Sequence, residues 1–513
     1  MWGKDKMNKS LNKFFQKSLD FIEIAGNKLP HPATLFLIFA LMVPFVSLIA
    51  YLFQWSTVHP ATGELIEPVN LLSKNGLHLI ITEMVSNFTG FAPLGVVVVA
   101  MLGIGVAEES GLISALVRLI VLSAPRRILT FVIVFTGILT NVASDVGYVL
   151  LIPLAGVIFV AFRRNPIVGM AAAFAGVSGG FSANLALGTI DPLLAGLSEE
   201  AAQIIDINYT VNPTANYYFM VVSTFFIAIV GTLITEKVTE PRYTKIHPVA
   251  ADNTIEKLLP KERKALRAAT FALLIMLVLV LIGIIPENGI LRGSDNGLLT
   301  SPLIKGVVAF IFIVGAVCGI VYGFVSGKFK NDAEVMKGME TSMVTIAGYL
   351  VLAFFAAQFI AYFKWSNLGI IFAIKGAGFL TSLNIGLIPL LILFIILSGT
   401  INLFIGSASA KWALLAPVFI PMFMIMGYSP ELSQVVYRIG DSVTNIISPM
   451  MSFFVLVIAF FQRYDKNAGM GTIISIMLPY SIGFFIIWSL LLIAWILLGL
   501  PLGPGVGLHY TGL

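Results

Sequence analysis

Polar and charged residues occur near the end of the chain, inside a stretch that is flanked by long apolar runs. This stretch, YRIGDSVTNIISPMMSFF (437–454), contains Asp441, Ser442 and Asn445 together with the helix-interrupting Pro449. Carboxylate, hydroxyl and amide oxygens are the ligands that hard cations prefer. The stretch therefore predicts an ion site formed by Asp441, Ser442 and Asn445. With Na⁺ as the ion, Asp441 and Asn445 would be the metal ligands, whereas an intramembrane aspartate can instead carry a proton. The sequence leaves both open.

A second polar interruption, GGFSANLALGTIDP (179–192), has a similar composition. It begins with a pair of glycines and offers Asn184 and Asp191. Where a helix is broken inside a membrane, its free N-terminus attracts anions and its unwound carbonyl groups attract cations. Asn184 and Asp191 are therefore candidate substrate-binding residues.

Two further interruptions form another related pair. GILTNVASDVGYVLLIP contains Asp145, and LFIGSASAKWALLAP contains Ser409, Lys411 and Trp412. An ammonium group at membrane depth needs a negative partner, which predicts that Lys411 pairs with Asp145 or with an anionic substrate. Trp412 can stack on an aromatic substrate.

The composition places these interruptions within a lipid bilayer. The chain of 513 residues is 58% hydrophobic and 11% charged, and its mean hydropathy is +0.96. A soluble protein of this length cannot bury so much apolar surface. Long uninterrupted apolar runs predict an all-α polytopic membrane protein rather than a β-barrel. The single cysteine, Cys318, excludes an intrachain disulfide.

Lysine and arginine gather in a few loops, which the positive-inside rule assigns to the cytoplasm. The cation-poor segments 54–76, 286–300 and 501–513 are then external. This predicts a cytoplasmic N-terminus, an external C-terminus and no role in nucleic-acid binding. The expected organisation is an interfacial helix over 1–28, a first membrane half over 29–237, a charged cytoplasmic loop over 238–267 and a second membrane half over 268–513.

The two halves resemble each other in three places. ASDVGYVLLIP matches ASAKWALLAP, GGFSANLALGTIDP matches IGDSVTNIISP, and NFTGFAPLG precedes the first pair much as KWSNLG precedes the second. The offsets all lie at roughly 260–280 residues. Matches in the same order predict two structural repeats with broken helices, which is the usual plan of secondary transporters.

Signatures of other classes are missing from the sequence. It has no Walker loop, nucleophile elbow or HExxH motif, and its five histidines have no metal-ligand spacing. We therefore expect a transporter that runs on an ion gradient or on the gradient of its solute. We expect no catalytic residues and no cofactor, apart from Na⁺ if that is the coupling ion.

Five long motifs together resemble the AbgT family, the p-aminobenzoyl-glutamate transporters. They are NKLPHPATLF, NFTGFAPLGVVVVAMLGIGVAEESGLI, AGVSGGFSANLALGTIDPLLAG, INLFIGSASAKWALLAPVFIPM and YRIGDSVTNIISPMMSFF. The resemblance implies a homodimer in the bacterial inner membrane. It further implies about nine transmembrane helices and two re-entrant hairpins in each protomer, the hairpins lying here around 87–95 and 364–369.

The resemblance also implies a function and site residues. Family members are associated with uptake of the folate catabolite p-aminobenzoyl-glutamate or with efflux of sulfonamide antimetabolites, by symport or antiport with Na⁺ or protons. The matching motifs put the family's site positions on Asp191, Ser409, Trp412, Asp441, Asn445 and Pro449. Asn402, in INLF, also falls in the transport core and is a candidate for both substrate and ion binding. The substrate has two carboxylates and an aromatic ring, which Lys411 and Trp412 suit.

Two alternatives remain open from the sequence. One is an ion-coupled carrier for another organic anion, such as a dicarboxylate. The other is an intramembrane hydrolase that cleaves the aminobenzoyl-glutamate amide, which would need a nucleophile with a base in reach.

Overall fold

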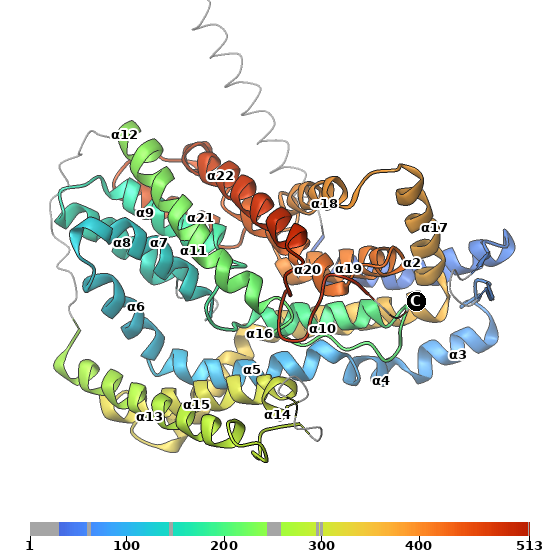
Figure 1. Ribbon diagram of the computed structural model, residues 1–513, viewed down its shortest axis with the longest axis horizontal. Helices are drawn as coiled ribbons and strands as arrows, with labels where there is room; N and C mark the ends of the chain where they lie inside the picture. Colours follow the sequence, from blue (N-terminus) through green and yellow to red (C-terminus); the bar gives the residue numbers. More distant parts are fainter. Residues whose placement is uncertain are drawn as a thin grey trace, which may run out of the picture.

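The computed structural model describes residues 30–58, 63–142, 147–243, 258–293, 297, 301–510 and 512. These residues form an almost entirely helical protein (Figure 1), and the strands β1 (Thr57–Val58) and β2 (Leu65–Ile66) pair as a small antiparallel ribbon. Within the described ranges, seven helices are long and apolar enough to cross a membrane, or eight if the bent pair α5–α6 counts as one span. The all-α polytopic membrane fold is thereby confirmed.

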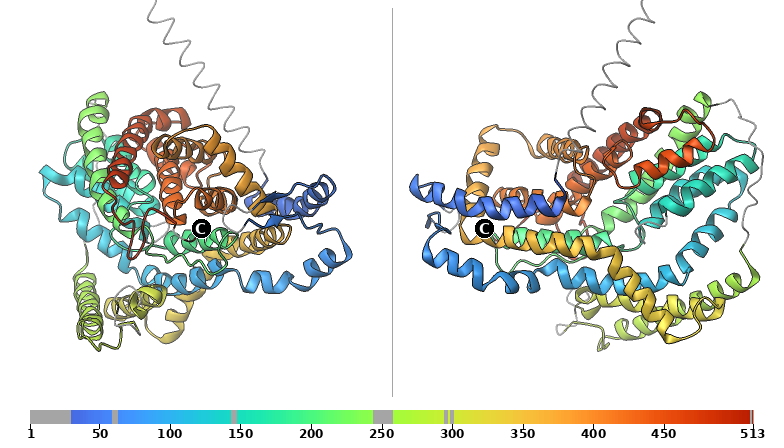
Figure 2. Two further views of the ribbon diagram at one scale, coloured as in Figure 1. Left: turned by 45° about the vertical axis from the view of Figure 1, so that its right-hand side comes forward. Right: turned by 180° about the vertical axis from the view of Figure 1, so that it is seen from behind.

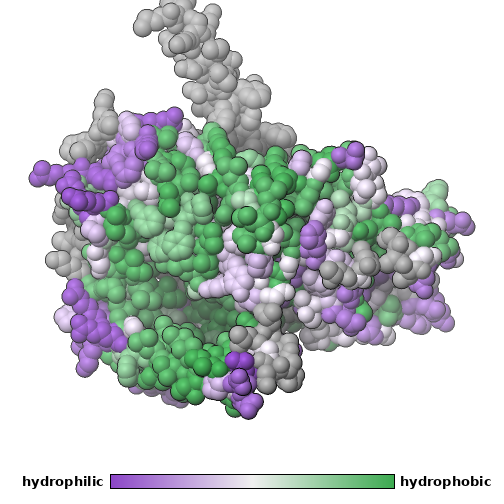
Figure 3. Space-filling model, viewed as in Figure 1, coloured by the Kyte–Doolittle hydropathy of each residue, from purple (hydrophilic) through white to green (hydrophobic). Residues whose placement is uncertain are grey.

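The surface has the character that lipid contact requires. Apolar residues cover most of the face in Figure 3, and hydrophilic residues gather mainly toward its left and right ends. In α13, 17% of the apolar window is buried inside the protein, and Phe271, Val278 and Ile282 are strongly exposed. Such a helix is stable only against lipid or another protein.

One group of helices, which we call the scaffold, packs in a chain of contacts from α13 through α15, α5 and α16 to α2. Figures 1 and 2 show α13 and α15 along one edge of the molecule. The scaffold comprises α2 (Pro32–Leu52), α3 (Lys74–Thr82), α4 (Met84–Thr89), α5 (Ala92–Glu109), α13 (Pro260–Ile284), α14 (Pro302–Lys305), α15 (Val307–Ser326) and α16 (Asp332–Trp365).

A second group, which we call the core, contains most of the buried polar residues. It comprises α7 (Leu129–Leu139), α8 (Ile152–Ala161), α9 (Pro166–Phe174), α10 (Ile190–Ala202), α11 (Tyr217–Ile234), α18 (Leu387–Asn402), α19 (Ala408–Ile425), α20 (Pro430–Asn445), α21 (Phe454–Gln462) and α22 (Met470–Leu497). Connecting helices are α6 (Leu112–Leu122), α12 (Glu240–Arg242) and α17 (Leu368–Ser382), and short 3₁₀ or π segments are η1 (Arg126–Ile128), η2 (Thr140–Val142), η3 (Gly147–Leu151), η4 (Ala175–Gly179) and η5 (Thr235–Thr239).

Helices α7 and α8 form a hairpin that does not span a bilayer. At its open end, Arg164 Nη1 donates a hydrogen bond to Thr130 Oγ1 over 2.8 Å. At its closed end, Gly147 lies directly against Thr140. The chain therefore enters and leaves on the same side. Helix α8 continues directly from η3, and the combined helix Gly147–Ala161 is about 22 Å long, shorter than the hydrocarbon core of about 30 Å.

Helices α18 and α19 form the corresponding second hairpin. The rings of Phe394 and Phe419 stack at 4.5 Å, so the two helices run back along each other from a tip at 403–407. Ser407 caps α19 by accepting a hydrogen bond from the Ala410 amide over 3.3 Å. The tip of the first hairpin thus lies in the interruption GILTNVASDVGYVLLIP, and the tip of the second lies in the related interruption LFIGSASAKWALLAP.

The hairpins do not lie where the resemblance suggested, around 87–95 and 364–369. In the first segment, Asn87 Nδ2 donates to Gln358 Oε1 of α16 over 2.9 Å. Helix α5 then continues along α16, where Gly105 packs against Ser342. Helices α4 and α5 therefore follow α16 in one direction instead of reversing.

The second segment, 364–369, is the junction between α16 and α17, at which Asn367 adopts a left-handed conformation with φ of 59°. The two expected positions were wrong because a match between repeats marks equivalent positions without showing which of them reverses the chain. The two matched segments are nevertheless alike in the structure, because each is a junction between two helices, α4–α5 in the first and α16–α17 in the second.

The breaks lie within the two stretches that the sequence predicts, but in the second stretch residues 440–445 remain helical and the break follows them. Helix α9 continues through η4 to Gly179, and α10 begins at Ile190. Helix α20 ends at Asn445 and α21 begins at Phe454, because Pro449 lacks an amide hydrogen and cannot continue the ladder. The Ser182 amide donates to Ser442 Oγ over 3.1 Å, so the two breaks lie side by side.

A glycine joins each hairpin tip to the neighbouring break. Gly188 of the first break lies against the backbone of Asn141 in the first tip. Gly406 of the second tip lies against the backbone of Met450 in the second break. Because a Cβ atom would overlap backbone in both places, only glycine permits this approach.

The predicted loop 238–267 is partly helical in the structure. Helix α12 continues directly from η5, and α13 begins at Pro260, where Glu262 accepts a hydrogen bond from the Leu259 amide over 2.8 Å. The segment 244–257 and the predicted interfacial helix over 1–28 lie outside the described residues.

Gly440 allows α18 and α20 to cross closely, because a Cβ there would overlap Ser398 Oγ and the Ile395 carbonyl oxygen. We expect Gly440→Ala to lower the free energy of unfolding by about 1–3 kcal/mol through overpacking. The measurement is thermal unfolding of the detergent-purified protein. Gly378→Ala is the matched control, since nothing lies within 4 Å of that added Cβ. Equal stability of the two variants would contradict the prediction.

Candidate functional site

A cavity of about 210 Å³ lies where both hairpin tips and both helix breaks meet. We call it the central cavity. Each of the four elements contributes to its wall, which is lined by Asn141, Tyr148, Phe181, Thr189, Ile190, Gly406, Ala408, Asn445, Met451, Ser452 and Phe453. The four polar interruptions thus converge around one hollow, as the sequence analysis expects.

Beside this cavity, Lys411 forms a buried ion pair with Asp441. Lys411 Nζ contacts Asp441 Oδ1 and also Asn402 Oδ1. The side chains of Lys411 and Asp441 are 0% and 1% exposed. Asp145, which the sequence analysis offered as a partner of Lys411, lies outside the described residues. The carboxylate in contact with Lys411 is that of Asp441.

Asn402 holds this ion pair in a fixed arrangement. Its Nδ2 lies 2.8 Å from the Asp441 carbonyl oxygen, from Thr444 Oγ1 and from Asn445 Oδ1. These acceptors orient the amide so that its oxygen faces Lys411. Asn445 Nδ2 in turn donates to Asp441 Oδ2 over 3.3 Å. Four predicted site residues, Asn402, Lys411, Asp441 and Asn445, therefore form one network.

Ser442 belongs to a different contact from the other predicted ion ligands. Its hydroxyl accepts the hydrogen bond from the Ser182 amide, and its position on α20 turns it toward the first break. A serine at this position thus joins the two repeats, whereas Asn402 supplies the oxygen that approaches the Lys411 ammonium.

Asp191 pairs with an arginine that the sequence analysis did not select. Arg438 Nη2 donates to Asp191 Oδ1 over 2.6 Å, and the Gly188 amide donates to Asp191 Oδ2 over 2.7 Å. The side chains of Arg438 and Asp191 are 4% and 1% exposed. Arg438 could have been selected from the sequence, because it is a cation three residues before Asp441 in a stretch already identified as polar.

Trp412 does not face a cavity in this structure. Its ring is fully buried and stacks on Tyr437 with centroids 4.5 Å apart. Its Nε1 donates to Ser198 Oγ over 2.9 Å, and Ser198 Oγ donates in turn to Gln434 Oε1. Trp412 therefore joins α19 to α10 and α20, and the expected stacking on a substrate has no support in this arrangement.

The remaining predicted residues lie around the breaks and tips. Ser409 contacts Ser407 through their hydroxyl groups at 3.3 Å and lines a larger cavity of about 570 Å³. This larger cavity shares Gly406 and Ser452 with the central cavity. Asn184 accepts a hydrogen bond from the Leu185 amide over 2.8 Å and does not line the central cavity.

Sequence reasoning missed the aromatic wall of the central cavity. Tyr148 and Phe453 stack with centroids 4.5 Å apart, and Phe181 also lines this cavity. Asn141 also lines the cavity, and its buried Oδ1 has no hydrogen-bond partner among the described residues. The apolar runs around these residues gave no signal that their rings face a cavity.

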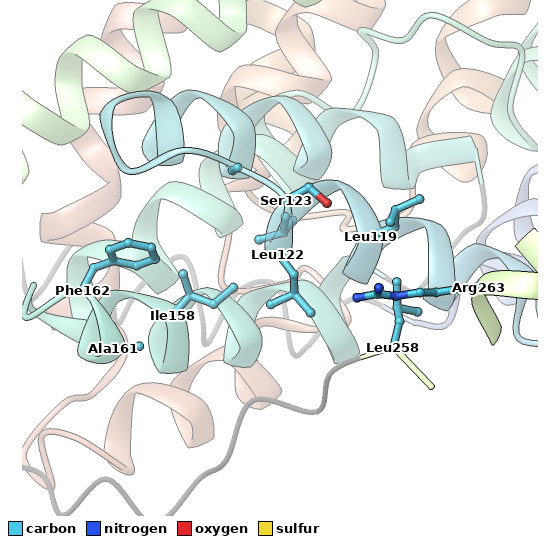
Figure 4. A pocket seen from close by; sticks show the side chains of 10 residues that line it. Leu119, Leu122, Ser123, Ile158, Ala161, Phe162, Leu258 and Arg263 are labelled. Carbon is cyan, nitrogen blue, oxygen red and sulfur yellow. The ribbon is translucent and has the colours of Figure 1, made fainter. Parts of the chain in front are cut away.

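Two other hollows contain none of the predicted site residues. One, of about 460 Å³, lies between α6, α8 and the start of α13, with Arg263 at its edge (Figure 4). The other, of about 740 Å³, is mostly apolar and separates scaffold helices from the first break at Leu185, Ala186 and Leu187.

The Asp191–Arg438 pair yields a stability prediction. Arg438→Met leaves a buried carboxylate without its cation, which we expect to cost about 3–5 kcal/mol in unfolding free energy. The double variant Arg438→Met/Asp191→Asn should recover most of this loss. Arg118→Met is the control, because the Arg118–Glu262 pair is more exposed and should cost about 1 kcal/mol or less. Thermal unfolding of wild type and the three purified variants tests this; no recovery in the double variant would contradict it.

Comparison with known proteins places the chain in a family. The model of the AbgT putative transporter family matches residues 17–510. The p-aminobenzoyl-glutamate transport protein of Escherichia coli (strain K12) is 37% identical over 491 residues, which cover 96% of this chain and 96% of that protein. The Alcanivorax borkumensis YdaH transporter has 48% identity and a TM-score of 0.90, covering 93% of this chain and 100% of that one. Neisseria gonorrhoeae MtrF, described as illuminating a class of antimetabolite efflux pumps, has 49% identity and a TM-score of 0.89, covering 95% of this chain and 99% of that one. The chain therefore belongs to the AbgT family of transporters.

Proposed function

We propose that this chain is an ion-coupled secondary transporter of aromatic organic anions of the p-aminobenzoyl-glutamate type. The observation that carries the proposal is the central cavity, at which an aromatic wall, two helix N-termini and a buried charged network meet. The Escherichia coli relative's name supports the substrate class. The proposal includes the inner membrane, the homodimer and a cytoplasmic N-terminus.

The carboxylates of such a substrate are matched by helix N-termini. Thr189 and Ile190 stand at the start of α10, and Ala408 stands at the start of α19, and all three line the central cavity. Free amide groups and the positive end of the helix dipole favour a carboxylate there. Ser409, in the adjoining larger cavity, adds a hydroxyl group.

The aromatic ring of the substrate is matched by Tyr148, Phe181 and Phe453, which replace Trp412 in our proposal. Together the two adjoining cavities offer space of the order that organic ligands require, about 300–1,000 Å³. Movement of the core against the scaffold would then expose the site alternately to the two sides of the membrane. Coupling to Na⁺ or to protons is assigned to the network around Asp441.

Export is the second candidate. It is supported by MtrF, which is described as an antimetabolite efflux pump and is 49% identical. A sulfonamide has an aromatic amine but lacks the two carboxylates of p-aminobenzoyl-glutamate, so the aromatic wall would serve both substrates. The family placement favours a transporter over the amide hydrolase, and Ser409 has a serine, not a base, as its hydroxyl contact.

Counterflow in proteoliposomes tests the proposal. Vesicles loaded with p-aminobenzoyl-glutamate should take up the labelled compound, and imposed Na⁺ and pH gradients, applied separately, identify the coupling ion. Succinate and citrate serve as competitors for the dicarboxylate alternative, and product analysis of the same vesicles tests hydrolysis. Absence of exchange with p-aminobenzoyl-glutamate and with sulfonamides would refute the proposal.

Asp441→Asn should reduce ion-driven uptake at least about tenfold, because a neutral amide cannot balance a cation in the membrane. Uptake under an imposed gradient is the measurement, with size-exclusion profiles confirming that the variant folds. Asp332→Asn, at the exposed start of α16, is the control and should leave uptake unchanged. Gradient-driven uptake by Asp441→Asn within about twofold of wild type would rule out this role.

Phe181→Leu and Tyr148→Leu should weaken binding of p-aminobenzoyl-glutamate by about 2- to 10-fold, the range expected for loss of an aromatic pair. An aliphatic N-acyl-glutamate, which keeps both carboxylates, should lose little. Competition against labelled substrate measures both affinities. Phe225→Leu, on the exposed face of α11, is the matched control. Equal losses for the aromatic and aliphatic compounds would argue against ring recognition at this wall.

A further inference from the structure

We infer that Lys411 is a tethered cation that competes with the coupling ion for the same oxygen ligands. The inference rests on the proposed function, because it concerns the ion site assigned there. From the sequence, the expected partner of Lys411 is Asp145 or an anionic substrate. In the structure, its partners are Asp441 and Asn402.

The first support is the identity of the atoms in contact. Two of the oxygens that this network could offer a cation, Asp441 Oδ1 and Asn402 Oδ1, both contact Lys411 Nζ. Asn402 cannot easily turn its oxygen elsewhere, because its Nδ2 is held by the Asp441 carbonyl, Thr444 and Asn445. In this conformation the ligand set therefore accommodates the ammonium group and does not fit a metal ion in addition.

The second support is the charge balance. Lys411 lies in the first turn of α19, where the helix dipole disfavours a positive side chain. Its fully buried position therefore depends on Asp441. A Na⁺ ion at Asp441 Oδ1 would stand beside the ammonium in a medium of low dielectric constant, where like charges repel strongly. Occupation by the ion and by Lys411 is thus mutually exclusive.

The third support is the place to which Lys411 can move. Ala408, one turn before Lys411, lines the central cavity, and Ser409 lines the adjoining larger one. An ammonium group displaced from Asp441 stays attached to the first turn of α19, which follows the tip that borders both cavities. There it can pair with a carboxylate of the organic anion, so that arrival of the cation and binding of the anion favour each other.

Sodium-dependent thermal stabilisation of the full-length protein in detergent tests this inference without measuring transport. Wild type, Lys411→Met, Lys411→Arg and the double variant Lys411→Met/Asp441→Asn are purified in sodium chloride and exchanged into choline chloride. Sodium chloride then replaces choline chloride at constant ionic strength. Lys375→Met, which removes an exposed lysine of α17, is the matched control.

We expect Lys411→Met to be stabilised by Na⁺ with a midpoint concentration at least about tenfold lower than that of wild type, within the usual range of coupling between sites. Lys411→Arg keeps a tethered cation and should respond like wild type, as should Lys375→Met. The double variant lacks the carboxylate and should lose the response. The inference is overturned if Lys411→Met and wild type have equal Na⁺ midpoints, or if the double variant responds as strongly as Lys411→Met.

Failure of this inference is distinguishable from failure of the proposed function. If wild type exchanges p-aminobenzoyl-glutamate but wild type and Lys411→Met have equal Na⁺ midpoints, the competition is refuted and the transporter assignment stands. If Lys411→Met has a lower Na⁺ midpoint than wild type but no aromatic anion is exchanged, the competition stands and the substrate assignment is refuted.

Discussion

An ammonium group and a carboxylate that are both shut off from solvent, Lys411 and Asp441, form the contact on which the rest of the core depends. Either charge alone would cost several kcal/mol at this depth. The pair is tolerated because Asn402 and Asn445 supply further hydrogen bonds to it. These partners come from α18, α19 and α20, so the second hairpin and the second broken helix must stay in one fixed arrangement for the charges to remain satisfied. Glycines 399, 406 and 440 provide the close backbone approach that this arrangement requires.

Helix α20 extends the same constraint to the first repeat. Arg438 and Asp441 lie three residues apart, on neighbouring positions of one helix face. Arg438 pairs with Asp191 at the start of α10, whereas Asp441 pairs with Lys411 at the start of α19. Among the described residues, these two ion pairs are the ones that are almost completely buried. One helix therefore holds an element of each repeat through opposite charges, and a shift of α20 along its axis would disturb both contacts together.

The sequence was sufficient for the features that depend on local chemistry. Apolar runs predict the all-α membrane fold, and Gly179, Gly180 and Pro449 predict the breaks in α9–α10 and α20–α21. Contacts between residues far apart in the sequence were harder to predict. Asp441 and Asn402 were both selected, but nothing in their spacing showed that Lys411 would lie between them. Trp412 has the chemistry of a ligand-stacking residue, yet Tyr437 covers it. The hairpins were misplaced because the resemblance between the halves identifies equivalent positions and does not reveal the direction of the chain.

The repeats explain how one fold provides two kinds of surface around the central cavity. Aligned on Pro153 and Pro417, Gly147 and Tyr148 of the first tip correspond to Lys411 and Trp412 of the second. Aligned on Gly180 and Gly440, Phe181 corresponds to Asp441. The first repeat thus has a glycine and a phenylalanine where the second has the ion pair, and the hydrogen bond between Ser182 and Ser442 joins equivalent positions. Related backbones meet at the cavity, where the first repeat contributes Tyr148 and Phe181 and the second contributes Asn445 and Phe453. The ion pair of the second repeat lies buried behind Asn445. Two identical repeats would offer a ligand the same surface twice, whereas these two repeats offer unlike surfaces.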